Sequence, residues 1–518
     1  MQFDTVIVGG GLCGLVLADA LRQNGQTFAL FEARERLGGR ILSEKDNVSG
    51  MMVDLGPCWF WPEVQPRLLK LVNALGLVHF PQHDNGAILS LTDPNQPPEQ
   101  LTVESVHGGA HRVAGGMGAM VTALAQHLAA EAIHLQHELV ALEDKGDHVE
   151  LHFRHNDTEV IIYAKQVVLT LPPRLLAEHV RFTPVLDASL LQAMRTTHTW
   201  MADQAKMVMG YHTAFWREAG YSGNAFVNHA QVVLAEIYDA CDADAEHAAL
   251  GGFVAMTPEA RAPYAVSMPM LLESQLGQVF GMNAINGELH YQDWANEKFS
   301  CATLDRVPLQ AHPVYANHKL REQHWGGKLL LGGSETASQA GGYLEGALDA
   351  GARLALILST HQSPLPADAK HANELGNFSR WVAAQRSQAQ EHYHSHLNRA
   401  LAAQQKQQLT QQALLDTVEQ IYSDALQRLG TLPLDTHNVT VEQGRSALTP
   451  VVLTPFNGFI RELVDTALEF NRNSCAISNF PQEAAPDAPY LDAIRRDMSA
   501  AWREFALSVN DALLEKSA

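Results

Sequence analysis

Three glycines near the start of the chain constrain its fold more than any other feature. Gly9, Gly11 and Gly14 form a G-x-G-x-x-G directly after the apolar run Thr5–Val8, which predicts a buried parallel strand. The first glycine permits a tight turn, the second lets the backbone approach a pyrophosphate, and the third lets a helix pack closely on the strand. The N-terminal N–H groups of that helix then face a phosphate. The pattern predicts a dinucleotide-binding βαβ unit.

A second strand and an acidic residue complete this unit. We expect the helix over residues 15–24 and the second strand over Thr27–Phe31. Glu32 stands at the end of that strand, where an acidic side chain hydrogen-bonds the ribose of a dinucleotide. Because strand, glycines, helix and acid all follow at the expected spacings, the motif is specific rather than a chance match.

The residues after Glu32 favour FAD over NAD. Arg34 precedes Leu37-Gly38-Gly39-Arg40, in which two glycines let the backbone pass close to a bulky cofactor and Arg40 can pair with its phosphates. The run Glu-Ala-Arg-x-Arg-x-Gly-Gly-Arg resembles the signature of the flavin amine oxidase family, which includes monoamine and polyamine oxidases. The resemblance covers about residues 3–360. It implies an α/β fold, with a Rossmann-like FAD-binding domain and a mixed-sheet substrate domain.

Later stretches resemble the other flavin-contacting segments of that family. They comprise a Gly-Pro loop after an apolar strand, a position beside the adenine, a tryptophan that walls the flavin, and glycines before a helix at 347–358. Together with the first motif, the resemblance implies that the cofactor contacts are Gly9, Gly11, Gly14, Glu32, Arg34, Gly39, Arg40, Gly56, Pro57, Cys58, Trp59, Val140, Trp294, Gly333, Ser334, Gly342, Tyr343 and Leu344.

Lys206 is the strongest candidate for a catalytic role. It is the one lysine of a predicted strand, Ala205–Tyr211, whose side chains alternate between the two faces of a sheet. Most lysines in strands lie at a solvent-exposed end. The resemblance implies instead a lysine that holds a water against flavin N5. It also implies that Tyr343 flanks the substrate amine, whereas the second position of the family's aromatic cage falls at Leu304. Half of that cage is therefore missing, which weakens the case for a simple arylalkylamine substrate.

The segment around Cys301 bears on how the flavin is held. Phe299–Thr303 resembles the segment that carries the covalent flavin link in monoamine oxidases, but Thr303 occupies the linking position. Cys301 comes two residues earlier and, on a strand, would point to the same face. We expect FAD to be bound without a covalent bond.

The composition excludes several classes of function. Lys and Arg total 36 against 57 Asp and Glu, and the resulting net charge of −21 argues against nucleic acid and anionic membranes as partners. The five cysteines lack a C-x-x-C, so neither a disulfide framework nor a metal site is expected. Only Met1–Asp4 precede the first strand, and no apolar run approaches the length of a membrane span. We expect a cytoplasmic protein without a membrane anchor.

The predicted domains are discontinuous. The FAD-binding domain takes residues 1–75, 130–200 and 290–360, and the substrate-binding domain takes 76–129 and 201–289, with 79–102 expected as loops. Residues 365–518 form a helical extension with helices over 373–408, 411–429, 456–470 and 490–514. Breaks are expected at 430–433, 449–455 and 481–489. This extension could cover the substrate entrance, form a homo-oligomer interface or bind a partner.

The expected reaction removes a hydride from the C–H beside an amine nitrogen, giving an imine and, with O2, H2O2. Three alternatives stay open. An L-amino-acid oxidase needs an arginine for the substrate carboxylate, and none follows the second flavin loop before Arg67. A flavin-dependent desaturase would expose an apolar entrance. A non-catalytic FAD scaffold would use the helical tail to bind a partner, and it would have no need of Lys206.

Overall fold

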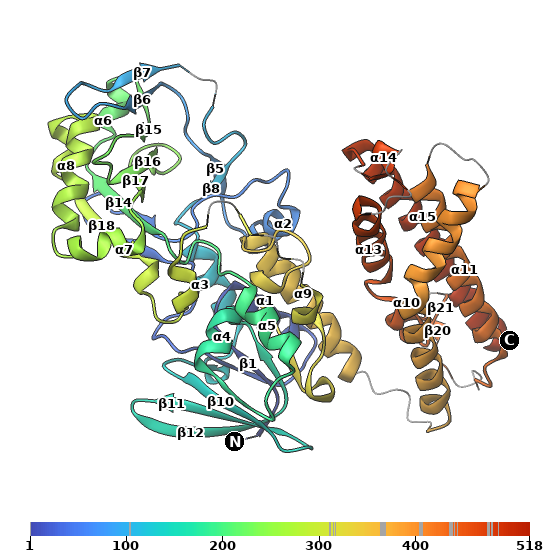
Figure 1. Ribbon diagram of the computed structural model, residues 1–518. Helices are drawn as coiled ribbons and strands as arrows, with labels where there is room; N and C mark the ends of the chain where they lie inside the picture. The colour runs from blue at the N-terminus through green and yellow to red at the C-terminus, as the bar shows by residue number, and fades with distance from the viewer. Residues whose placement is uncertain are drawn as a thin grey trace. The chain divides into compact units, whose positions relative to one another are not determined.

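The computed structural model describes most of the chain and divides it into two compact units. The described residues are 2–102, 105–309, 312–313, 315, 317–362, 369–402, 408–434, 439, 441–442, 444–473, 477, 480–484 and 486–517. The first unit is Met1–Ser359 and the second is Thr360–Ala518, drawn from blue to yellow and from orange to red in Figure 1. Each unit has its own hydrophobic core.

The first unit contains an eight-stranded sheet with the predicted parallel centre. Its strands are β1 (Gln2–Val8), β2 (Phe28–Phe31), β9 (Ile133–His134), β10 (Glu138–Asp144), β11 (Val149–His155), β12 (Thr158–Leu169), β13 (Arg181–Thr183) and β19 (Leu329–Leu331). Strands β19, β12, β1, β2 and β9 run parallel, while β10 and β11 join β12 as an antiparallel meander. Helices cover both faces, so the C-terminal ends of the central strands, 6–8, 167–169 and 329–331, are apolar and buried.

Helices α1 (Leu12–Gln23), α3 (Gly118–His127) and α9 (Leu344–Gln362) pack on one face of this sheet. Helices α4 (Pro173–His179) and α5 (Ala188–Thr196) pack on the other. Helix α1 begins at Leu12, three residues before its expected start. Helix α3 falls within the stretch expected to belong to the substrate domain, yet Met120 and Leu124 share a core cluster with Leu15 of α1.

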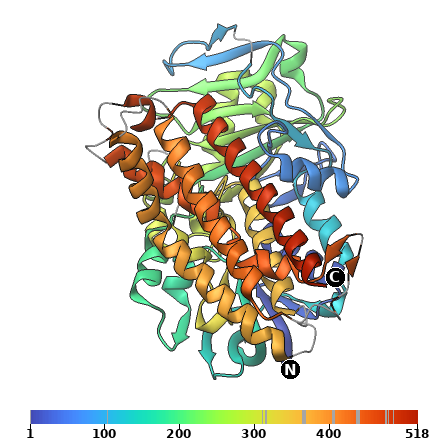
Figure 2. The same cartoon turned by 90° about the vertical axis from the view of Figure 1, so that its right-hand side faces the viewer.

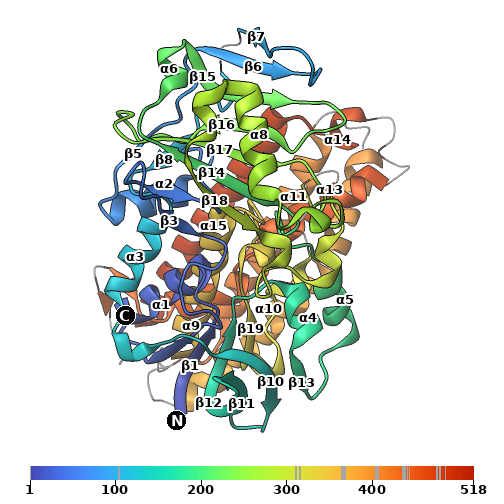
Figure 3. The same cartoon turned by 90° about the vertical axis from the view of Figure 1, so that its left-hand side faces the viewer.

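A second, seven-stranded sheet forms the other half of this unit. Its order is β18 (Glu288–Asp293), β14 (Ala205–Tyr211), β17 (Ala248–Val254), β16 (Leu234–Asp239), β15 (Tyr221–Val227), β6 (Ala87–Leu91) and β7 (Glu99–Leu101). Helix α8 (Met268–Phe280) lies across one face, where Leu272 and Leu276 pack in the cluster that contains Met207 (Figure 3). The strands are mostly antiparallel, and β15 and β6 pair in parallel. The predicted fold class, a Rossmann-like domain with a mixed-sheet partner, is confirmed.

The expectation that 79–102 consists of loops is wrong. Strands β5 (His79–Pro81), β6 and β7 lie within it, and Ile88, Leu89 and Leu91 of β6 are buried. Strand β6 pairs with the nearby β7 and with β15, which lies more than a hundred residues away in the sequence. The polar composition around β6 concealed this strand, since the long-range pairing with β15 is not visible in the local sequence.

Shorter elements connect these layers. They are β3 (Ser43–Lys45), β4 (Met52–Asp54), α2 (Pro66–Ala74), β8 (His111–Val113), α6 (Phe215–Glu218) and α7 (Pro258–Arg261), with 3-10 helices at Ala130–Ala132, Ala262–Tyr264, Met282–Ile285, Trp294–Asn296, Thr303–Arg306, His318–Arg321, Trp325–Gly327 and Ser334–Thr336.

The second unit is a helical bundle, as the sequence predicts. Its long helices are α10 (Ala369–Ala402), α11 (Leu409–Thr431), α13 (Phe459–Asn473) and α15 (Ala488–Ser517), and α10, α11 and α15 run side by side (Figure 2). The stretch expected as a break at 449–455 instead contains helix α12 (Thr449–Leu453) and the start of a 3-10 turn, Thr454–Phe456. The unit also contains a short hairpin (Val441–Glu442 and Arg445–Ser446) and helix α14 (Pro481–Ala484). Residues 403–407 of the first expected helix lie outside the described residues. Among the described helices, none is both long and apolar enough to span a membrane.

Candidate functional site

The glycine-rich turn leaves open space at one glycine only. Gly9 has φ +109°, and a Cβ on it would lie 2.7 Å from Oγ1 of Thr170. A Cβ on Gly14 would lie 2.0 Å from the Gly9 oxygen, so both positions are closed by the protein itself. A Cβ on Gly11 would meet nothing within 4 Å. Gly11 precedes α1 and its side of the turn is therefore free for a ligand that approaches the helix N-terminus.

Glu32 is fixed beside this turn. The buried carboxylate accepts from Gly10 N at 2.7 Å and from Arg34 N at 3.0 Å, and each bond uses a different oxygen. The Arg34 guanidinium also pairs with Glu32 at 3.4 Å and donates to Ser300 Oγ at 2.9 Å. Glu32 is thus oriented at the end of β2, where a ribose diol can donate to its remaining lone pairs.

Three further segments meet the turn. A Cβ on Gly39 would lie 3.3 Å from Gly11 Cα, and one on Gly56 would lie 2.1 Å from the Arg40 oxygen. Arg40 pairs with Glu335 at 2.7 Å and donates to Ser334 Oγ at 3.1 Å. The predicted contacts 9–14, 39–40, 56–59 and 333–334 are therefore brought together, and Glu335 is a member of this group that sequence reasoning missed. The open position at Gly11, the helix N-terminus and the oriented Glu32 fit a dinucleotide such as FAD.

Lys206 lies inside the protein rather than at a solvated strand end. It is 2% exposed, and Nζ donates to the Gly56 oxygen at 2.7 Å. The Tyr238 and Phe253 rings each lie 5.5 Å from Nζ. Among the described residues, no carboxylate lies within ion-pair distance of this ammonium. The pairing of β14 with β17 and β18 aims Lys206 at the loop that holds the predicted flavin contacts.

Two tryptophans hold that loop. Trp294 Nε1 donates to the Leu55 oxygen at 3.0 Å, and Trp59 packs against Tyr238 with ring centroids 4.6 Å apart. Cys58 is buried, with Sγ 3.7 Å from the Tyr238 hydroxyl. Burial raises the pKa of Tyr238 well above its ordinary value, so this hydroxyl stays protonated. Pro57 lies between these fixed residues.

A polar network that the sequence did not reveal lies beside Trp59. The His107 ring is 4.4 Å from the Trp59 ring, and its two nitrogens contact Asp84 at 3.0 Å and Glu236 at 3.3 Å. Burial alone would lower the pKa of His107, but the hydrogen bonds with Glu236 and Asp84 outweigh it and raise that pKa. Burial opposes ionisation of Asp84, yet bonds from Ser105 and His107 bring its pKa to about 2. The imidazole thus lies between two carboxylates, an arrangement that favours its protonated form.

Tyr343 faces a histidine rather than a second aromatic residue of the predicted cage. The Tyr343 and His312 rings are stacked, with centroids 4.8 Å apart and planes at 3°, and Trp200 lies against His312 at 4.4 Å. Leu304, the predicted second cage position, is 53% exposed, and its carbonyl accepts from Arg174. No local motif pointed to His312, because its pairing with Tyr343 is a tertiary contact.

The remaining predicted contacts lie at element boundaries. Val140 sits at a register shift between β10 and β11, which turns its backbone away from regular pairing. Gly342 has φ +82°, and Leu344 begins helix α9. Gly333 N donates to Cys13 Sγ at 3.3 Å, which joins this segment to the start of α1.

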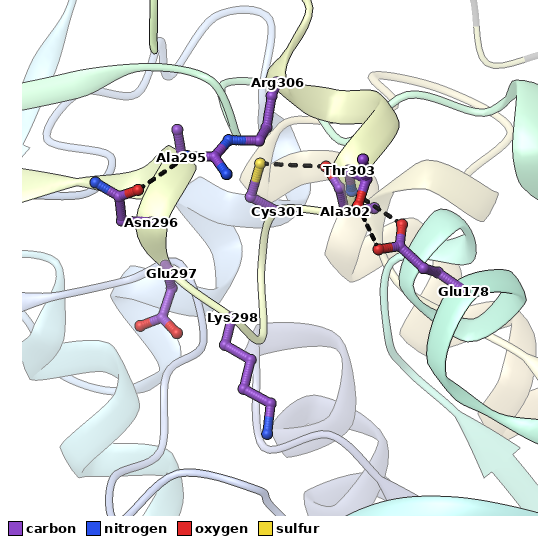
Figure 4. Close-up of a pocket in the computed structure, with 9 residues that line it drawn as sticks. All are labelled: Glu178, Ala295, Asn296, Glu297, Lys298, Cys301, Ala302, Thr303 and Arg306. Carbon is purple, nitrogen blue, oxygen red and sulfur yellow. Dashed lines mark hydrogen bonds between the residues drawn. The ribbon is translucent and has the colours of Figure 1, made fainter. Parts of the chain in front are cut away.

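Cys301 lines a surface pocket of about 210 Å³ with Glu178, Asn296, Glu297, Lys298, Thr303 and Arg306 (Figure 4). The strand expected at 299–303 is absent: a turn leads into the 3-10 helix Thr303–Arg306, since Asp305 and Glu178 bind the backbone N–H groups of Ala302 and Thr303. Burial, aided by Asp305, raises the pKa of the Cys301 thiol to about 12. This thiol is therefore a poor nucleophile at neutral pH.

The chain resembles proteins of known family. Residues 7–75 match a model described as an NAD(P)-binding Rossmann-like domain, and residues 96–357, about half of the chain, match one described as flavin containing amine oxidoreductase. Flavin-containing amine oxidase B of Sus scrofa is 22% identical over 466 residues, covering 70% of this chain and 88% of that protein.

Solved structures share the fold. Wild-type putrescine oxidase bound to putrescine matches with a TM-score of 0.57 at 20% identity, over 70% of this chain and 99% of that chain. Cyclohexylamine oxidase from Brevibacterium oxydans matches with a TM-score of 0.56 at 20% identity, over 70% of this chain and 100% of that one.

Proposed function

The chain belongs to the flavin containing amine oxidoreductases, FAD-dependent enzymes, and on that premise we propose that it oxidises small amines to imines. Bound FAD would supply the acceptor for a hydride from the C–H beside the neutral amine nitrogen, with O2 as the final oxidant that is reduced to H2O2. Water then hydrolyses the imine. The chain's own residues orient the amine, exclude water and control protons.

The observation that carries this proposal is the position of Lys206. Its ammonium has three N–H donors, and among the described residues only the Gly56 oxygen accepts from it within hydrogen-bond distance. The remaining donors can hold a water molecule next to the loop that carries Gly56 and Trp59. A buried lysine without a carboxylate partner is costly, which favours a catalytic role over a structural one.

The amine is proposed to bind against Tyr343. Tyr343 is 41% exposed and His312 stacks on one face of its ring, so the amine is proposed to approach the other face. Because the rings are only 4.8 Å apart, an amine cannot enter between them and must approach the free side of Tyr343 or displace His312. This differs from a cage of two parallel tyrosines.

The flavin is proposed to be held without a covalent bond. Cys301 is neither at the aligned linking position nor a thiolate, and its sulfur contacts the Ala302 carbonyl (Figure 4). Residues 1–75, 130–200 and 290–360 are proposed as the FAD-binding part and 76–129 with 201–289 as the substrate-binding part. The buried, unpaired cysteines 13, 58 and 241 support a reducing compartment, and we propose the cytoplasm.

The test is anaerobic reduction of the purified holoenzyme by a panel of amines, amino acids and other nitrogen donors, followed as loss of flavin absorbance. We expect one class of amine to reduce the flavin, and Lys206→Met to slow turnover with O2 about 100-fold or more. Lys165→Met, which removes an exposed lysine paired with Asp4, is the matched control. Acid denaturation should release free FAD.

If no donor reduces bound FAD and Lys206→Met leaves the spectrum and turnover unchanged, the chain is a non-catalytic flavoprotein. Reduction by amino acids alone would favour the amino-acid oxidase, and reduction by a saturated hydrocarbon skeleton without nitrogen would favour a desaturase.

A further inference from the structure

A second pocket lies beside the Trp59 loop. It has a volume of about 230 Å³, and its walls include Phe80, Gln82, His83, Arg112, Arg217 and Asp239. Gln82 joins it to the predicted flavin contacts, since Trp59 Nε1 donates to Gln82 Oε1 at 2.8 Å. Gln82 Nε2 in turn donates to the Asp239 oxygen at 2.7 Å. The pocket is therefore rigidly connected to the candidate active site.

Arg112 is a buried cation that forms no ion pair with a carboxylate of the described residues. It lies on β8 and is 5% exposed, and its Nη1 donates to the Cys241 oxygen at 2.7 Å. Its Nε is buried and has no hydrogen-bond partner. Among the described residues, no carboxylate lies within 4 Å of its guanidinium. The centroid of the Phe80 ring lies 6.0 Å from its guanidinium carbon.

The carboxylates in this region are engaged elsewhere. Asp239 accepts from Arg217 through both oxygens, at 2.7 and 2.8 Å, and also from Trp216. Asp54 accepts from Ser43 and from Met117 N, although its carboxyl still senses Arg112.

Two further titratable groups near the pocket, Asp242 and His83, do not offer Arg112 an ion-pair partner. Asp242 contacts His247 at 2.5 Å. Burial lowers the pKa of His83, so this ring adds no positive charge at neutral pH. An isolated buried guanidinium is strongly disfavoured unless an anion pairs with it.

We propose that this pocket binds a carboxylate, which pairs with the Arg112 guanidinium. The planar fork of arginine matches the two oxygens of a carboxylate, and Arg112 lines the wall of this pocket. The volume is below the 300 Å³ or more that drug-sized ligands occupy, so the occupant is a small molecule. Asp239 and Asp242 in the pocket wall disfavour doubly charged anions such as phosphate.

The carboxylate has two chemical sources. It can belong to the amine substrate itself, which would then extend from the Trp59 loop to Arg112; this version rests on the proposed function. Alternatively it belongs to a separate carboxylic acid that binds beside the active site, and that version requires no amine oxidation.

The test uses three molecules that share one carbon skeleton: butyrate, butylamine and 4-aminobutyrate. Binding of butyrate to the holoenzyme is measured by calorimetry and by the flavin absorbance spectrum, and amine oxidation is measured by anaerobic flavin reduction. The variants are Arg112→Met, which removes the charge, and Arg112→Lys, which keeps the charge but loses the fork. Lys298→Met, in the pocket of Figure 4, removes one positive charge elsewhere as a control.

We expect wild type to bind butyrate, Arg112→Met to weaken binding about tenfold or more, Arg112→Lys to weaken it less, and Lys298→Met to bind normally. A higher kcat/KM for 4-aminobutyrate than for butylamine, lost in Arg112→Met, assigns the carboxylate to the substrate. Equal rates with intact butyrate binding assign it to a separate acid.

The proposal is overturned if butyrate does not bind wild type, or if butyrate binds both Arg112 variants as tightly as it binds wild type. It is also overturned if phosphate binds more tightly than butyrate. Should Arg112→Met fail to fold, Arg112→Lys alone decides the result. If no amine reduces the flavin, the proposed function is wrong, but the butyrate-binding measurement still tests the carboxylate site.

Discussion

Substitution of Gly11 by alanine should separate cofactor binding from folding. The added methyl would meet no protein atom within 4 Å, so the fold can accept it. The helix N-cap becomes slightly worse, at a cost of about 0.5–1 kcal/mol in the free energy of unfolding. A phosphate that accepts from the N–H groups of this turn lies about 2.9 Å from their nitrogens. The added methyl group would occupy the space through which the phosphate reaches these N–H groups.

The expected loss in FAD affinity follows from the hydrogen bonds that the methyl displaces. A hydrogen bond to a charged group contributes about 1.5–3 kcal/mol, so losing one corresponds to about 10- to 100-fold weaker binding. Titration of the apoprotein with FAD, followed by flavin fluorescence, measures this change, and thermal unfolding of the apoprotein measures the cost to the fold.

Two other glycines serve as comparisons. Gly14→Ala places a Cβ 2.0 Å from a backbone oxygen, so it should lose both FAD binding and stability. Gly25 is exposed after α1 with φ +67° and open surroundings, and Gly25→Ala should cost about 1 kcal/mol of stability while FAD affinity stays normal. Normal FAD affinity in Gly11→Ala would refute the reasoning, because the phosphates then do not pass over this residue.

Two further outcomes concern groups outside the cofactor turn. The pKa of His107 is raised in the fold, so its network stabilises the protein fully below about pH 6.5, and this contribution is lost as pH rises through the raised value. The difference in melting temperature between wild type and His107→Gln should therefore shrink from pH 6 to pH 9; a constant difference would contradict a charged imidazolium. In the second unit, buried Glu483 accepts from Leu409 N and Thr410 N, both at 2.9 Å, at the start of α11. Glu483→Gln should lower the unfolding free energy in urea by about 1–3 kcal/mol, whereas Glu504→Gln, at an exposed position, should change it little; equal effects would show that Glu483 does not stabilise the helix terminus.

The local pattern of the sequence determined the first βαβ unit, the glycine turn and the helical nature of the C-terminal unit. Each of these depends on residues close together in the chain. Gly9 and Gly14 are needed because strand, turn and helix come within van der Waals contact inside one short segment. The apolar spacing of α11 and α15 likewise identifies them as helices without reference to their partners.

Only the tertiary structure decided which distant side chains meet. Strand β6 joins the sheet by pairing with β15, and the pKa of His107 is raised because Asp84 and Glu236 converge on it from separate segments. Tyr343 stacks on His312 for the same reason. Nothing in the sequence around Arg112 indicates that it is buried. Only the structure shows that its Nε has no hydrogen-bond partner and that Asp239 binds Arg217 instead. Burial and pairing are properties of the assembled fold, since they depend on atoms that the local sequence does not contain.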